Sequence, residues 1–184
     1  LEKYNIAWIE DVAPWMNTNI FKKISEHTTI PVCTGEDIYL AHNFEPLMKD
    51  RAISVVHPDV LTIGGAMEMK KLEGMCDRYG IAAAIHMAES PIAFMAAVHI
   101  AASMKNVMAI EFHSADHPEW FNLVKGLPDP LIKDGYVQVP DAPGLGIEDI
   151  NETTVKKYLH KEYCGFFEDT SEWNREWAND REWS

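Results

Sequence analysis

Short apolar runs alternate with helical stretches along the chain, and this alternation limits the fold more than any other feature of the sequence. Five runs rich in β-branched or small residues predict strands at residues 6–10, 30–35, 53–59, 81–86 and 107–112. Between them, apolar residues spaced three to four apart predict helices at residues 20–27, 40–49, 66–79 and 91–104. Because parallel neighbours need a crossover, usually a helix, the pattern predicts an α/β fold with parallel strands.

Every predicted strand ends at or beside an ionisable residue. These residues are Glu10, Glu36, Asp59, His86 and Glu111. In a closed barrel the carboxyl ends of the strands converge on one face, whereas the outer strands of an open sheet lie too far apart to share a substrate. The strand ends therefore favour part of a (β/α)8 barrel of the TIM type over a doubly wound sheet, an alternative that the periodicity alone leaves open.

Composition and charge exclude several classes of partner. The 184 residues carry a formal net charge of −13, which argues against nucleic acid or an anionic membrane surface and suits a metal cation. No apolar run is long enough to cross a bilayer. Cys33, Cys76 and Cys164 form no CxxC pair, so we expect neither a disulfide framework nor a zinc site, but a reducing, cytoplasmic location.

Two acidic pairs, Glu10–Asp11 and Glu36–Asp37, lie at the carboxyl ends of the first two predicted strands. Carboxylates at barrel strand ends are suitable ligands for Mg²⁺, which prefers oxygen. Taken singly, each of these acids is more often a solvated loop residue, so the interpretation depends on their joint placement.

Asp59 and His86 end adjacent strands, which would bring a carboxylate within hydrogen-bond reach of an imidazole. Such a carboxylate fixes the tautomer and leaves the other ring nitrogen free to accept a proton. A lone histidine in an apolar segment is more often a core residue, and we interpret His57 and His99 in that way. Glu111 is either an ordinary strand-end acid or, if protonated, a hydrogen-bond donor to a developing oxyanion.

The regular alternation stops after the fifth strand. We expect a partial barrel at residues 1–117 and a segment rich in proline and glycine at 118–164, which would close the barrel. An acidic tail at 165–184 contains Trp173, Trp177 and Trp183, and either a short amphipathic helix or a frayed end is compatible with it. His113 and Asp116 are weaker candidates for substrate contacts.

The sequence resembles the mandelate racemase subgroup of the enolase superfamily over residues 6–150. The resemblance is carried by the segments WIEDVAPW, TGEDIY, HPDVLTIGGAMEMKKL, AIHMAESPIAFMAAVHIAA, AIEFH and VPDAPGLGIE. It implies that Glu10 and Glu36 are the second and third Mg²⁺ ligands, that Asp59 and His86 form an Asp–His dyad, and that Glu111 hydrogen-bonds the enolate oxygen. The similar muconate-lactonising subgroup would have a lysine in place of Asp59.

The resemblance also implies that part of the fold is supplied by other residues. About three of the eight barrel strands, including those that carry the first metal ligand and a set of basic residues, would lie upstream together with the capping domain. Residues 118–164 would contact that domain. We therefore expect five of the eight βα units here, and we expect activity to require the upstream part. A homo-oligomer is the expected assembly.

The implied reaction is abstraction of the proton next to a carboxylate. We expect dehydration of a sugar acid, with a racemase or epimerase of a 2-hydroxy acid as the alternative within the family. The alternative from another class is a non-catalytic fragment, or a binding or assembly module. A measurement of stoichiometric Mg²⁺ binding would help to distinguish an enzyme from these.

Overall fold

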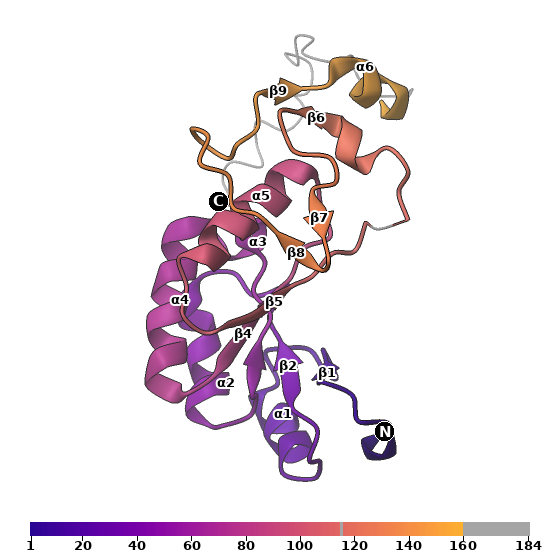
Figure 1. The fold of residues 1–184 in the computed structure, drawn as a ribbon. Coiled ribbons are helices and arrows are strands. Elements are labelled where there is room, and N and C mark those ends of the chain that lie inside the picture. Colours follow the sequence, from indigo (N-terminus) through magenta and orange to yellow (C-terminus); the bar gives the residue numbers. More distant parts are fainter. Residues whose placement is uncertain (115, 160–184) are drawn as a thin grey trace, which may run out of the picture.

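Five parallel strands form one sheet in the order in which they occur along the chain (Figure 1). The computed structural model describes residues 1–114 and 116–159. The strands are β1 (Ile9–Glu10), β2 (Val32–Thr34), β3 (Val55–Val56), β4 (Ala82–Ile85) and β5 (Val107–Ile110). Each pairs in parallel with the next, so β1 and β5 are the two edges of the sheet. The predicted α/β fold is confirmed.

The strands are shorter than the sequence predicts, and prolines limit the ladder at two of them. Pro31 directly precedes β2 and Pro58 follows β3, and neither has a backbone N–H to donate. Single hydrogen bonds nevertheless continue the register beyond the strands. The backbone N–H groups of His57, His86 and Glu111 each donate to a carbonyl of the preceding strand or its extension, at 2.8–3.1 Å.

Helices cover one face of the sheet, as right-handed crossovers require (Figure 1). They are α1 (Thr18–Ser25), α2 (Glu45–Lys49) with the 3-10 turn η2 (Ala41–Phe44) before it, α3 (Val60–Ile63), α4 (Ala66–Tyr79) and α5 (Pro91–Ala102). The four predicted helices are present, with the second divided between η2 and α2. None of the described helices is long and apolar enough to cross a membrane.

The short helix α3 is absent from the sequence prediction. Its residues are mostly β-branched, which disfavours a helix. Asp59 starts it nevertheless, because the side-chain oxygen Oδ1 accepts the N–H groups of Leu61 (2.7 Å) and Thr62 (2.9 Å). A residue singled out for chemistry is therefore also a helix cap.

The two faces of the sheet differ in side-chain size, because successive residues of a strand point to opposite faces. Val32, Val56 and Ile85 belong to the main core, which includes the fully buried helix residues Phe44, Leu47, Met69, Leu72 and Met95. The alternate residues Cys33, Val55 and Ala84 form a small second cluster with Trp8. The same alternation continues beyond the strands with four polar residues: Glu10, His57, Asp59 and His86. The face with the smaller side chains is therefore the one that carries the polar side chains of the site.

The residues after β5 form small elements beyond one end of the sheet (Figure 1). They are η3 (Trp120–Leu123), β6 (Val124–Lys125) paired with β9 (Asp149–Ile150), the hairpin β7 (Ile132–Lys133) and β8 (Tyr136–Val137), α6 (Glu152–Val155) and η4 (Lys156–Tyr158). The buried ring of Trp120 packs edge-on against Phe94 of α5 and Phe112, with centroids 5.6 and 5.1 Å away.

The predicted domain boundaries at 117 and 164 stay predictions, as does closure of the barrel by residues 118–164. The tail at 165–184, with its three tryptophans, and Cys164 lie outside the described residues. The homo-oligomer likewise stays a prediction.

Candidate active site

The five predicted site residues lie together and are joined by a continuous series of short contacts. His86 Nδ1 is 3.0 Å from Asp59 Oδ2. His86 Nε2 is 3.4 Å from Glu36 Oε2 and 3.6 Å from Glu111 Oε2. His57, which the sequence analysis interprets as structural, connects this group to Glu10: its Nε2 is 3.4 Å from Glu111 Oε2 and 3.6 Å from Glu10 Oε2.

Asp59 is held as a carboxylate with a fixed orientation. Its Oδ1 accepts the two N–H groups at the start of α3, and its Oδ2 lies against His86 Nδ1. Burial alone would raise the pKa of Asp59, but the hydrogen bonds from Thr62, His86 and Leu61 outweigh burial and hold the pKa below its ordinary value. An ionised Asp59 can only accept, so Nδ1 of His86 carries the hydrogen and Nε2 is left with its lone pair.

His86 has the environment of a base. Burial lowers its pKa, but the hydrogen bond to Asp59 and the negative charges of Glu36 and Glu111 raise it, and the net pKa lies above the ordinary value. The imidazole is mostly buried, and Nε2 faces Glu36, which follows β2, and Glu111, which follows β5. The basic nitrogen therefore points into the group of carboxylates, away from the helices.

Glu89 lies beside the Asp59–His86 dyad and was not predicted from the sequence. A ligand atom of each of Asp59, His86 and Glu89 lies within 4.8 Å of the others. Burial, followed by the Asp59 carboxylate, raises the pKa of Glu89, which favours an acid form that can donate to Asp59. Its backbone carbonyl accepts the indole N–H of Trp120 at 2.8 Å, which ties this loop to the core.

Three acids at the ends of β1 and β2 suit a hard cation. One carboxylate oxygen each from Glu10, Asp11 and Glu36 lies within 4.8 Å of the other two. Burial and then the charges of Asp11, Asp37 and Glu10 raise the pKa of Glu36, and His86 only partly offsets this. A cation between these oxygens would remove the repulsion, and an oxygen-only set matches Mg²⁺. Asp11 is not among the ligands predicted from the sequence.

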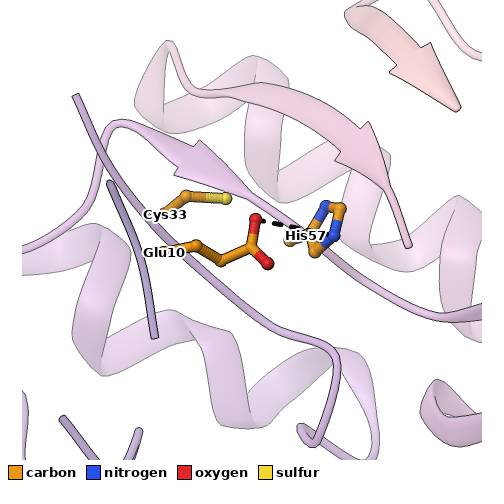
Figure 2. A group of neighbouring side chains, drawn as sticks. All are labelled: Glu10, Cys33 and His57. Carbon is orange, nitrogen blue, oxygen red and sulfur yellow. Dashed lines mark ion pairs between the residues drawn. The ribbon is translucent and has the colours of Figure 1, made fainter. Parts of the chain in front are cut away.

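A second group around Glu10 includes sulfur. Figure 2 shows Glu10 facing His57, with Cys33 beside them, and their potential ligand atoms also lie within 4.8 Å of one another. Cys33 is fully buried, and burial strongly raises the pKa of its thiol. Because the thiolate is the form that binds metals, this group is the poorer candidate for a metal site.

Glu111 lies against both histidines of the site. Its Oε2 accepts the N–H of Met87 at 3.3 Å in addition to its contacts with both imidazoles. A cavity of about 140 Å³ adjoins it, lined among others by Trp8, Glu10 and His57. This is space for a few atoms of a small molecule.

The two weaker candidates for substrate contact do not join the group. His113 and Asp116 are exposed in the turn after β5. Within residues 1–114 and 116–159, no hydrogen bond or ion pair connects either of them with the five predicted residues. Their role stays a prediction.

Comparison with known proteins gives consistent matches. The sequence profile described as "Enolase C-terminal domain-like" matches residues 1–153. The chain is 35% identical over 147 residues to D-xylonate dehydratase of Haloferax volcanii, covering 80% of this chain and 35% of that protein. It is 30% identical over 165 residues to a D-mannonate dehydratase of Caulobacter sp. (strain K31), covering 88% and 40%.

The solved structures agree with the sequences. A mandelate racemase/muconate lactonizing enzyme-like protein from Rubrobacter xylanophilus has a TM-score of 0.84 at 30% identity, over 91% of this chain and 42% of that one. The chain thus spans well under half the length of the relatives it matches.

Proposed function

Because the chain belongs to the enolase superfamily, in the mandelate racemase-type family whose carboxyl-terminal domain it matches, we propose that it carries the acid–base half of a magnesium-dependent sugar-acid dehydratase. The observation that carries the proposal is the imidazole of His86, with Nδ1 on the Asp59 carboxylate and Nε2 directed between Glu36 and Glu111.

His86 is the proposed general base. Its Nε2 accepts the proton from the carbon next to the substrate's carboxylate, and Asp59 stabilises the positive charge that develops on the ring. The pKa of His86 is raised for the same reason that the positive charge is stabilised: negative groups face both nitrogens of the ring. A hydrogen bond from Glu89 also lowers the pKa of Asp59.

Glu10, Asp11 and Glu36 are the proposed Mg²⁺ ligands of this chain. Bound there, the cation would act as a Lewis acid that withdraws charge from the substrate's carboxylate. Their oxygen-only donor set and the crowding of negative charge support this assignment. The ligand expected on an upstream strand would complete the set.

Glu111 is the proposed hydrogen-bond partner of the oxygen that becomes negative as the proton leaves. A hydrogen bond between Glu111 and that oxygen would act in the way that oxyanion donors stabilise charge that develops during a reaction. Dehydration then follows: the electron pair of the broken C–H bond forms a C=C bond as the C–O bond of the hydroxyl on the next carbon breaks. The departing hydroxide takes up the proton that His86 accepted and leaves as water, and the enol tautomerises to a 2-keto-3-deoxy acid.

The substrate class follows from the relatives. Those named above are dehydratases of D-xylonate and D-mannonate, both sugar acids. The upstream strands and the capping domain would supply the remaining ligand and the walls of the pocket. We also propose a cytoplasmic location, since Cys33 and Cys76 are buried free thiols.

A screen of acid sugars with the full-length protein and Mg²⁺ tests the proposal. We expect at least one aldonic acid to give a 2-keto-3-deoxy product, and we expect the His86→Asn protein to lose that activity while retaining its fold. A folded, Mg²⁺-loaded wild-type protein that neither dehydrates any member of the panel nor exchanges its α-proton with solvent would refute it.

A further inference from the structure

His57 connects two side chains that belong to opposite edges of the sheet. Glu10 ends β1 and Glu111 follows β5, whereas His57 follows the middle strand β3. One atom, His57 Nε2, nevertheless lies 3.6 Å from Glu10 Oε2 and 3.4 Å from Glu111 Oε2. Figure 2 shows the Glu10 carboxylate directed at the ring.

The other ring nitrogen fixes the orientation of His57. Nδ1 lies 2.8 Å from the carbonyl oxygen of Ala84 on β4. A carbonyl can only accept, so Nδ1 carries a hydrogen and donates it. The ring is packed between Trp8, with centroids 6.5 Å apart, and the edge of the His86 ring at 5.4 Å. With 3% of its surface exposed, the side chain is held in one position.

The backbone of His57 is fixed as firmly as the ring. Its N–H donates to the Thr34 carbonyl at 3.0 Å. Gly35, the residue after Thr34, lies so close that a Cβ there would be 2.9 Å from the backbone of His57. The chain can approach His57 this closely only because residue 35 has no side chain.

A space-filling role accounts for Nδ1 but not for Nε2. A buried side chain that only had to satisfy the Ala84 carbonyl could end at the position of Nδ1. Nε2 instead lies between a proposed metal ligand and the proposed partner of the developing oxyanion, within 4 Å of a carboxylate oxygen of each.

We propose that His57 is a positioning residue that holds the carboxyl groups of Glu10 and Glu111 in place, and so couples the metal site to the site where negative charge develops. The proposal rests on the proposed function. His57 does not contact substrate in this scheme, and it acts through its two neighbours, as an outer-shell partner does for a metal ligand.

Two amide variants separate the two ring nitrogens. In His57→Asn the side-chain nitrogen can replace Nδ1 and keep the Ala84 hydrogen bond, but the side chain is too short to meet the carboxyl groups. In His57→Gln the nitrogen reaches about as far as Nε2 and loses the Ala84 contact. We expect His57→Asn to weaken Mg²⁺ binding by about 10- to 100-fold, the range for lost outer-shell partners. The weakening in His57→Gln should be clearly smaller.

Calorimetric titration of the full-length variants with Mg²⁺ measures this effect, and chemical denaturation measures stability alongside it. His27 supplies the matched control, because its Nδ1 also lies against a backbone carbonyl, that of Lys23 at 2.7 Å, but the side chain is exposed. His27→Asn and His27→Gln should bind Mg²⁺ like the wild type. With a sugar acid that the wild-type protein dehydrates, His57→Asn should lower kcat and leave KM nearly unchanged, because Glu111 is misplaced.

The results distinguish this inference from the proposed function. If the wild type binds Mg²⁺ and both His57 variants bind it equally well, His57 is only structural and the inference is wrong. The inference is also wrong if Mg²⁺ affinity follows stability, with His57→Gln the weaker binder. A folded wild type without Mg²⁺ binding would refute the proposed function, and with it this role of His57.

Discussion

Replacing Asp59 by asparagine should separate the chemistry of the site from its stability. The amide oxygen can keep both hydrogen bonds that start α3, at 2.7 and 2.9 Å from Leu61 N and Thr62 N. The amide NH₂ would then face His86 Nδ1, which lies 3.0 Å from Oδ2 in the wild type. Two donors cannot form a hydrogen bond, so the ring hydrogen must move to Nε2.

The expected loss of rate follows from that change of tautomer. With its hydrogen on Nε2, His86 has no lone pair directed at Glu36 and Glu111 and cannot accept the substrate's proton. Loss of a general base costs about 100- to 10,000-fold, and the corresponding Asp→Asn change in the serine protease triad costs roughly 10,000-fold. We expect about 1,000- to 10,000-fold, which corresponds to roughly 4–5.5 kcal/mol in the barrier.

The expected loss of stability is much smaller. Asparagine is about as good an N-cap as aspartate, so α3 should persist. One hydrogen bond to a charged group is lost, worth about 1.5–3 kcal/mol, and the new contact between the amide and the imidazole offsets part of it. The net cost in the free energy of unfolding should be about 1 kcal/mol.

Deuterium exchange at the substrate's α-carbon, followed by NMR in D₂O with the full-length protein, measures the step directly. Asp77→Asn is the control, because Asp77 is an exposed acid on α4 whose side chain accepts from Asn106. Exchange at the wild-type rate in Asp59→Asn would refute the tautomer reasoning. A rate loss accompanied by unfolding would contradict the expected separation of chemistry from stability.

Three further outcomes are expected for the full-length protein. Gly35→Ala should cost about 1–3 kcal/mol in urea denaturation, because the new Cβ would lie 2.8 Å from Phe44 and 2.9 Å from the backbone of His57, and an unchanged midpoint would contradict this close approach. Because the pKa of folded His86 lies above 6.5, its charged contacts stabilise fully below pH 6.5 and progressively less as the pH rises through the folded value. The stability difference between wild type and His86→Asn should therefore shrink with rising pH, and a constant difference would count against the assigned shift. Glu36→Gln should weaken Mg²⁺ binding by at least about tenfold in a calorimetric titration and abolish any rise in unfolding temperature with Mg²⁺, whereas wild-type affinity would exclude Glu36 as a ligand.

The sequence predicts the strand order and the position of the acidic and imidazole side chains, because both depend on local patterns. In a parallel sheet with helical crossovers, the carboxyl ends of all strands must lie at the same end of the sheet. Glu10, Glu36, Asp59, His86 and Glu111 could therefore be brought together without knowledge of the tertiary structure.

The sequence does not predict contacts that depend on register or on unusual backbone geometry. Asp11 has a φ of 44°, which places a non-glycine residue in the left-handed region and brings its carboxylate near Glu10 and Glu36. The contacts of His57 Nε2 follow from the curvature of the sheet, which brings β1 and β5 to one imidazole. The sequence did indicate Asp11, because two acids stand side by side in WIED and again in TGED. For His57 the only indication was its position two residues before Asp59, which places both side chains on the same face of the strand.

The anchoring of Asp59 has a stereochemical consequence. Because Oδ1 is bound by two backbone amides and Oδ2 lies against His86, the carboxylate cannot rotate without breaking one of these bonds. The plane of the imidazole, and with it the side from which Nε2 can approach a bound substrate, is thereby set by the amides of Leu61 and Thr62. Under the proposed function, the enzyme should accept only one configuration at the carbon next to the carboxylate, and that handedness is imposed by the first turn of a four-residue helix.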